Sequence, residues 1–257
     1  MNVKTRKLGK GITNVVINDP KTYNYISFKT LRDLLNTFIQ LDKDNDTRVI
    51  ILEGSGKGFS AGHNLKEVGG TKNRSNHLKL FNLCSKLMMK IVEGKKPVIA
   101  KVHGAAYAAG CQLAASCDLA YSTTTATFAT PGVNIGLFCS TPMVAVSRKV
   151  TRKIMMKMLL TGEPINAKYA KDIGLINDCY SSKKLNSEVL KIAKTISSKS
   201  NLTIKIGKQA FYKQLEMPLG DAYKFTSKMM TLNMASQDAK EGISAFLQKR
   251  KPNWKNR

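Results

Sequence analysis

The first 54 residues alternate between two hydrophobic patterns, and this alternation limits the fold more than any other feature of the chain. Residues 11–19 (GITNVVIND) and 48–54 (RVIILEG) are short runs rich in β-branched side chains and bounded by turn residues, which is typical of buried strands. Between them, in residues 27–44, apolar side chains recur at helical spacing: Phe28, Leu31, Leu34, Leu35, Phe38 and Leu41. A strand, a helix and a second strand in this order predict an α/β architecture with parallel strand pairing.

The rest of the chain continues this alternation and then becomes helical. A helical pattern over residues 80–91 leads to a strand-like run at 97–104, and a second such run follows at 118–122. The last third of the chain consists of helical patterns separated by Gly, Pro, Asn or Ser. We therefore predict an α/β core domain over residues 1–195 and a helical region over residues 196–257.

The composition is strongly basic, with 42 Lys and Arg against 17 Asp and Glu and a formal net charge of +25. Such a charge favours polyanionic partners, namely nucleic acid, an acidic membrane surface or a phosphorylated cofactor; a surface merely rich in lysine explains it as well. The five cysteines contain no CxxC pair and the three histidines are widely separated. We therefore expect neither a disulfide framework nor a metal site.

No run of about 18 apolar residues is present, so no membrane-spanning helix is expected. The first residues lack the apolar segment of a secretory signal, which favours a soluble, cytoplasmic protein. Because these residues are basic, the mitochondrial matrix is the alternative compartment.

Two glycine-containing segments are suited to a ligand oxygen. In residues 54–65 (GSGKGFSAGHNL), the backbone N–H groups from Ala61 to Asn64 are open to a ligand. Residues 102–118 (VHGAAYAAGCQLAASCD) repeat this arrangement at the start of a helix. Paired backbone donors stabilise a developing oxyanion without any charged residue, although each segment alone is also compatible with an ordinary strand-to-helix turn.

Several motifs in a fixed order are similar to those of one family. They are the run 48–54, GKGFSAGHNL (56–65), KPVIAKVHGAAYAAGCQLAASCDLAYS (96–122), ATFATPGVNIGL (126–137), LLTGEPINAKYAKDIGLIN (159–177) and EGISAFLQKRKPNW (241–254). On these motifs the chain resembles the enoyl-CoA hydratase/isomerase (crotonase) superfamily over nearly its full length. ATPGVNIGLFCSTP and AFLQKRKP are most similar to the enoyl-CoA hydratase domain-containing proteins of that superfamily.

The resemblance implies a ClpP/crotonase-like spiral of ββα units, with the C-terminal helices as a trimerisation region and a hexamer built as a dimer of trimers. It implies an acyl-CoA thioester as substrate, with no permanently bound cofactor and no metal. Matched by position, the oxyanion hole would use the backbone N–H groups of His63 and Ala109. The first of these lies on a ligand-binding loop with three further matched residues, Ala61, Asn64 and Leu65.

Other positions that match the family carry further expectations. Phe246 and Lys249 match the segment that contacts the CoA nucleotide. Hydratases of this family use two glutamates to activate and protonate water, and those positions hold Gln112 and Gly132, neither of which carries a carboxylate. Efficient hydration of a 2-enoyl-CoA should therefore be absent, whereas a double-bond shift, a decarboxylation or a slow thioester hydrolysis stays open.

Two side chains are candidates to replace the missing carboxylates. Cys139 lies on a loop where some relatives carry a working Asp, and its thiol is a candidate nucleophile, with a small buried hydrophobe as the alternative. The ring of His63 is a candidate acid or base, unless it points away from the site.

The sequence thus predicts a protein of fatty-acid or acyl-CoA metabolism that polarises a thioester carbonyl. It would belong to the lyase or isomerase class if it is active, and the residues leave its status as an enzyme open. Two alternatives are a non-catalytic acyl-CoA-binding protein and an RNA-binding homologue that uses a lysine-rich face, although no RRM or KH motif is present.

Overall fold

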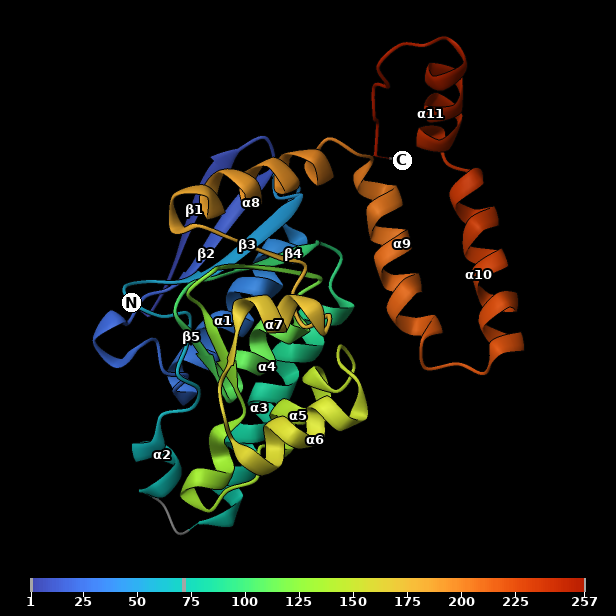
Figure 1. The fold of residues 1–257 in the computed structure, drawn as a ribbon. Coiled ribbons are helices and arrows are strands. Elements are labelled where there is room, and N and C mark those ends of the chain that lie inside the picture. The colour runs from blue at the N-terminus through green and yellow to red at the C-terminus, as the bar shows by residue number, and fades with distance from the viewer. Residues whose placement is uncertain (1, 71–72, 257) are drawn as a thin grey trace.

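The computed structural model describes residues 2–70 and 73–256. A six-stranded sheet has the order β1-β2-β3-β4-β6-β9 (Figure 1). Its strands are β1 (Val3–Gly9), β2 (Ile12–Ile17), β3 (Val49–Gly54), β4 (Val98–Val102), β6 (Leu119–Thr123) and β9 (Asp178–Tyr180). β1 and β2 form an antiparallel pair, and every later neighbour pairs in parallel, so the predicted α/β architecture with parallel pairing is confirmed.

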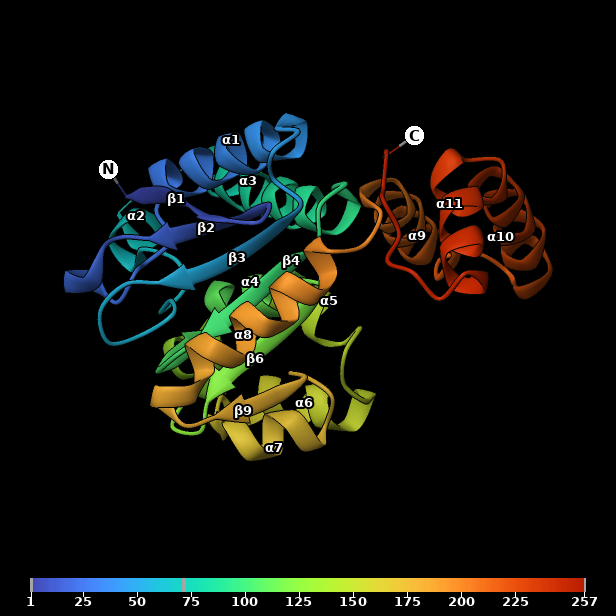
Figure 2. The ribbon, with the colours of Figure 1, turned by 90° about the horizontal axis from the view of Figure 1, so that it is seen from above.

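Helices cover both faces of this sheet, as a largely parallel sheet requires. Alternate residues of each strand point to opposite faces, so in β3 Ile50 and Leu52 pack on one side and Val49 and Ile51 on the other. The first side packs against α1 (Phe28–Lys43), α3 (Arg74–Glu93) and α4 (Ala109–Ser116). The second packs against α8 (Ser182–Ser197), which lies over the sheet in Figure 2.

Helix α1 illustrates how the sequence pattern becomes structure. Its N-cap Ser27 accepts a hydrogen bond from the Thr30 backbone N–H through Oγ, at 3.0 Å. Four of the six apolar positions predicted for this helix are buried, namely Leu31, Leu34, Phe38 and Leu41, whereas Leu35 is half-buried and Phe28, in the first turn, is exposed.

A second, three-stranded sheet supports the loops between the large sheet and its helices. Its order is β5 (Ala105–Tyr107), β7 (Thr127–Ala129) and β8 (Ile165–Asn166). The connections around it contain short helices: η1 (Pro20–Thr22), α2 (Leu65–Gly69), η2 (Pro131–Ile135), α5 (Ser140–Val146), α6 (Arg152–Thr161) and α7 (Ala167–Asp172). None of the helices in the described ranges is long and apolar enough to cross a bilayer.

The last three helices, α9 (Asn201–Gln214), α10 (Leu219–Met234) and α11 (Gln237–Leu247), stand to one side of the sheet (Figures 1 and 2). A largely buried ion pair joins them to the core: Nζ of Lys208 in α9 lies 2.7 Å from Oδ2 of Asp118, the residue just before β6. The helical C-terminal part is as expected. The predicted boundary between residues 195 and 196 falls in the last turn of α8, and the division into two domains stays a prediction.

Candidate active site

Two loops meet at the edge of the sheet, and glycines permit their close approach. The Tyr107 backbone N–H donates to the Ser60 carbonyl oxygen at 2.9 Å. A Cβ atom on Gly62, where φ is +95°, would lie 2.9 Å from the Cβ of Ala108, and one on Gly110 would lie 2.3 Å from the Ser60 oxygen. Because both contacts are shorter than side chains allow, these two positions require glycine.

Ala108 adopts a backbone conformation that is unusual for a residue with a side chain, with φ of 49° and ψ of −115°. The conformation is held in place because its N–H donates to the Ala129 oxygen at 2.9 Å and its own oxygen accepts from the Gln112 N–H at 3.0 Å. Such strain is found mainly where surrounding contacts enforce it, often at functional sites. Its consequence is that α4 begins abruptly at Ala109.

The backbone N–H groups of His63 and Ala109 donate to no acceptor within the described parts of the chain. Buried or half-buried backbone donors are nearly always paired, so two unpaired ones at the same place need an explanation. Both residues line one cavity of about 440 Å³.

This cavity is mainly apolar and brings together six of the residues proposed from the sequence. They are Ala61, His63, Leu65, Ala109, Gly132 and Cys139. Its other lining residues are Val68, Phe81, Ala108, Pro131, Asn134, Ile135, Leu137, Phe138, Ser140, Thr141 and Pro142. Among the described residues, no Asp, Glu, Lys or Arg lines it.

The His63 ring is held on two sides. Its Nδ1 lies 3.2 Å from the carbonyl oxygen of Ile26, and its plane meets the Phe81 ring edge-on, with the ring centroids 5.6 Å apart. Because a carbonyl oxygen only accepts, Nδ1 carries the proton and Nε2 is the unprotonated nitrogen. Nε2 is buried and has no hydrogen-bond partner. Burial lowers the pKa of the ring, against the opposing effects of the Ile26 hydrogen bond and the Glu67 charge.

Gly132 and Cys139 are in direct contact in the turn that follows β7. The Gly132 N–H donates to Sγ of Cys139 at 3.3 Å. A Cβ atom on Gly132 would lie 2.7 Å from the Leu137 oxygen and 2.9 Å from that Sγ, so the turn has no room for a side chain there. Cys139 is 7% exposed, and burial raises the pKa of its thiol although the Gly132 hydrogen bond opposes this. Its burial and raised pKa favour the small buried group over the nucleophile, and both roles stay predictions.

Two further predicted residues do not line the cavity. Gln112 is 3% exposed within α4, and its Oε1 accepts a weak bond from the Cys84 thiol at 3.8 Å. Asn64 is the N-cap of α2, where its Oδ1 accepts from the Lys66 N–H at 3.1 Å. The sequence does not predict the other residues of the cavity wall. Phe81 reads only as part of the helical pattern of α3, and residues 133–138 have no regular apolar spacing.

Comparison of the chain with known proteins shows its family. The protein-family model described as enoyl-CoA hydratase/isomerase matches residues 7–257. The chain belongs to the enoyl-CoA hydratase/isomerase family. It is 48% identical to human "Enoyl-CoA hydratase domain-containing protein 3, mitochondrial" over 244 residues, which cover 95% of this chain and 80% of the human protein. "Enoyl-CoA hydratase, mitochondrial" from Pongo abelii is 31% identical over 247 residues, covering 94% of this chain and 83% of that protein.

Solved structures of enoyl-CoA hydratase/isomerase proteins share the whole fold. A crystal structure of an enoyl-CoA hydratase from Mycobacterium smegmatis superposes with a TM-score of 0.97 at 42% identity, covering 99% of both chains. The human domain-containing protein 3 superposes with a TM-score of 0.96 at 47% identity, covering 99% of this chain and 100% of that chain. The crotonase-type α/β fold expected from the motifs is confirmed.

In this family member, Phe246 and Lys249 lie far from the cavity within the single chain. Phe246 is 83% exposed in α11, and Lys249 follows that helix with a φ of 55°. Figure 1 shows α11 at the opposite end of the molecule from α2, whose first residue, Leu65, lines the cavity.

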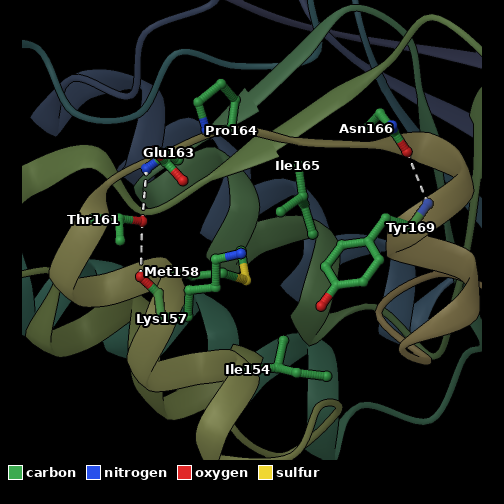
Figure 3. A pocket seen from close by; sticks show the side chains of 9 residues that line it. All are labelled: Ile154, Lys157, Met158, Thr161, Glu163, Pro164, Ile165, Asn166 and Tyr169. Carbon is green, nitrogen blue, oxygen red and sulfur yellow. Dashed lines mark hydrogen bonds between the residues drawn. The ribbon is translucent and has the colours of Figure 1, made fainter.

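A second cavity of about 300 Å³ lies between α6, β8 and α7 (Figure 3) and contains none of the predicted residues. Two of its polar side chains bond to the local backbone: Thr161 Oγ1 donates to the Lys157 oxygen at 2.9 Å, and Asn166 Oδ1 accepts from the Tyr169 N–H at 2.8 Å. The described residues contain no group of three or more His, Cys, Asp or Glu side chains that could hold a metal ion.

Proposed function

We propose that the protein binds an acyl-CoA thioester in the 440 Å³ cavity and polarises its carbonyl with the backbone N–H groups of His63 and Ala109. The observation that carries this proposal is that both donors lack an acceptor and line the same mainly apolar space. Two such donors stabilise negative charge on a thioester oxygen without a charged residue, and apolar walls strengthen that interaction.

Efficient hydration of 2-enoyl-CoA is not part of this proposal. Hydration needs a base to activate water and an acid to protonate carbon, and no described residue that lines the cavity carries a carboxylate. By resemblance, the two glutamates are replaced by Gln112 and Gly132. Gln112 is buried outside the lining, and Gly132 cannot gain a side chain without displacing Leu137 or Cys139.

The reaction class that fits is one that needs a polarised thioester and little more, such as a double-bond shift, a decarboxylation or a slow hydrolysis within fatty-acid or acyl-CoA metabolism. A non-catalytic acyl-CoA-binding protein is the first alternative. RNA binding through the basic surface is the second, and it rests on the net charge of +25.

We also propose a trimer, or a hexamer of two trimers, built on the C-terminal helices. The only buried residue of α10 is Ala222, although the helix carries several large apolar side chains. They include Leu219, Tyr223, Met230, Leu232 and Met234, each at least 46% exposed. A helix this apolar and this exposed needs a partner surface. In such an assembly Phe246 and Lys249 would contact CoA bound to a neighbouring subunit. Light scattering on the purified protein tests the subunit number.

The cytoplasm is the proposed compartment, with the mitochondrial matrix as the alternative that the names of the curated relatives support. Tagged full-length protein expressed in its own cells and followed by fractionation decides between them.

Calorimetric titration tests the central proposal. Hexanoyl-CoA, which has a thioester carbonyl and an apolar acyl chain, should bind more tightly than CoA alone, and crotonyl-CoA should bind without rapid loss of its conjugated absorbance. Equal affinity for CoA and hexanoyl-CoA would contradict acyl binding in the cavity. Salt-sensitive RNA binding that is unaffected by CoA would favour the RNA-binding alternative.

A further inference from the structure

The His63 ring does not have the surroundings of a proton carrier. An acid or base must reach the proton that it transfers, whereas Nε2 is covered from solvent and has no hydrogen-bond partner among the described residues. Nδ1 is already engaged with the Ile26 oxygen at 3.2 Å. One ring nitrogen is thus committed to a backbone carbonyl, and the other has no polar partner.

The ring instead closes a hydrogen-bonded clamp around its own backbone. The Ile26 N–H donates to the Gly62 oxygen at 2.7 Å, and the Ile26 oxygen accepts from the Asn64 N–H at 3.3 Å. The side chain of His63 donates to that same Ile26 oxygen, so three bonds tie residues 62–64 to one residue. The peptide N–H between these bonds, that of His63, is the one left unpaired.

The Phe81 ring fixes the remaining freedom of the imidazole. The two rings meet edge to face, at an interplanar angle of 72°, and Phe81 comes from α3, a long helix of the core. The imidazole is thereby held between the Ile26 carbonyl and a half-buried aromatic side chain of α3. Burial also lowers the pKa of the ring, which keeps it in the neutral form with the proton on Nδ1.

We propose that the imidazole of His63 is a positioning residue: by donating from Nδ1 to the Ile26 oxygen against Phe81, it fixes the direction in which the His63 backbone N–H is presented to a thioester carbonyl. This inference rests on the proposed function, since it assigns a device that serves the same donor pair. Preorganised donors stabilise an oxyanion because they need no reorganisation during the reaction.

Two amide substitutions separate positioning from proton transfer. In His63→Asn the amide nitrogen lies as many bonds from Cβ as Nδ1 does, so the bond to Ile26 can be kept. In His63→Gln it lies where Nε2 was, and that bond is lost. The readout is the infrared carbonyl stretch of hexanoyl-CoA labelled with ¹³C at the thioester carbon, because a hydrogen bond to the carbonyl oxygen lowers its frequency. Affinity for CoA, which has no acyl carbonyl, checks that each variant keeps a folded site.

The wild type should show a lowered frequency, His63→Asn should retain most of that shift, and His63→Gln should lose most of it. Phe81→Leu leaves residue 63 unchanged and should lose part of the frequency shift. Retention of the shift in His63→Gln, or equal loss in both amide variants, would overturn the positioning role. A wild type that binds hexanoyl-CoA with no shift would overturn the proposed function itself, and the positioning role with it.

Discussion

The Gly132 N–H donates to Sγ of Cys139 at 3.3 Å, so the two residues form one packed unit in the turn after β7. By resemblance, this turn holds a glutamate in hydratases of the family. A Cβ atom at position 132 would lie 2.9 Å from the sulfur and 2.7 Å from the Leu137 oxygen. The path of the turn, and not only the residue type at position 132, therefore leaves no room for a side chain there.

Restoring both glutamates should consequently fail to restore hydration. Gly132→Glu is expected to lower the free energy of unfolding by about 1–3 kcal/mol, the usual cost of overpacking. The double variant with Gln112→Glu should stay inactive on crotonyl-CoA, as followed by loss of enoyl absorbance. Gly69→Ala is the control, since nothing lies within 4 Å of its added Cβ, and it should change stability little. Rapid hydration by the double variant would show that the turn can move.

The largely buried ion pair between Lys208 and Asp118 should be a main attachment of the C-terminal helices. Lys208 Nζ also donates to the oxygens of Ile91 and Lys96, at 2.8 and 2.9 Å. Lys208→Met should cost about 3 kcal/mol, the lower end of the range for breaking a buried pair, because the largely buried Asp118 carboxylate keeps the Val98 N–H as a donor at 2.7 Å. Urea unfolding measures this, with the exposed Lys191→Met as a control expected to stay within about 0.5 kcal/mol. A loss no larger than that of the control would contradict the role.

Relief of the strain at Ala108 should stabilise the protein. Glycine tolerates a φ of 49° with a ψ of −115°, whereas a Cβ atom opposes it. Ala108→Gly is expected to raise the free energy of unfolding by about 1 kcal/mol. Ala114→Gly, in the interior of the same helix, should lower it by about 1 kcal/mol or more. Urea unfolding of both variants is the test: the free energy of unfolding should rise in Ala108→Gly and fall in Ala114→Gly. Equal losses in the two variants would contradict strain at Ala108.

Thiol reactivity should follow burial. Burial raises the pKa of Cys84 and of Cys111 to about 12, and it raises those of Cys117 and Cys139 as well. Since the thiolate is the reactive form, only the half-buried Cys179 should react readily with iodoacetamide in the native protein. Peptide mass spectrometry identifies the site, and urea should expose all five thiols. Labelling of Cys139 as fast as Cys179 would reopen its role as a nucleophile.

Stability should fall in mild acid because of His63. Its pKa in the folded state is lowered by burial from the ordinary 6.5, so the unfolded chain takes up the proton first. The contribution of neutral His63 to the free energy of unfolding is complete above about pH 6.5 and is lost as the pH falls through the lowered pKa. The nearby Glu67 charge opposes the lowering of that pKa and so makes the contribution smaller. Urea unfolding between pH 7.5 and 5, at about half-unit steps, should show a shallower decline in His63→Asn than in the wild type. Parallel declines would assign the effect to other groups.

The sequence alone determined the alternation of strands and helices, because apolar periodicity reports which face of each segment is buried. It also determined the family, because several motifs stand in a fixed order, and it marked the two glycine-containing loops that carry His63 and Ala109. Such patterns can be recognised in a single segment, even when the segment that packs against it is not known.

Tertiary structure decided what depends on contacts between distant residues. It placed Phe81 against His63 and Lys208 against Asp118, pairs that local spacing does not connect. It excluded Gln112 from the cavity lining although that residue lies one helical turn from Ala109. Only the path of the turn showed that Gly132 cannot accept a side chain. Packing is the physical reason in each case. The free space around a side chain is set by segments that are distant in the sequence and become neighbours only when the chain folds.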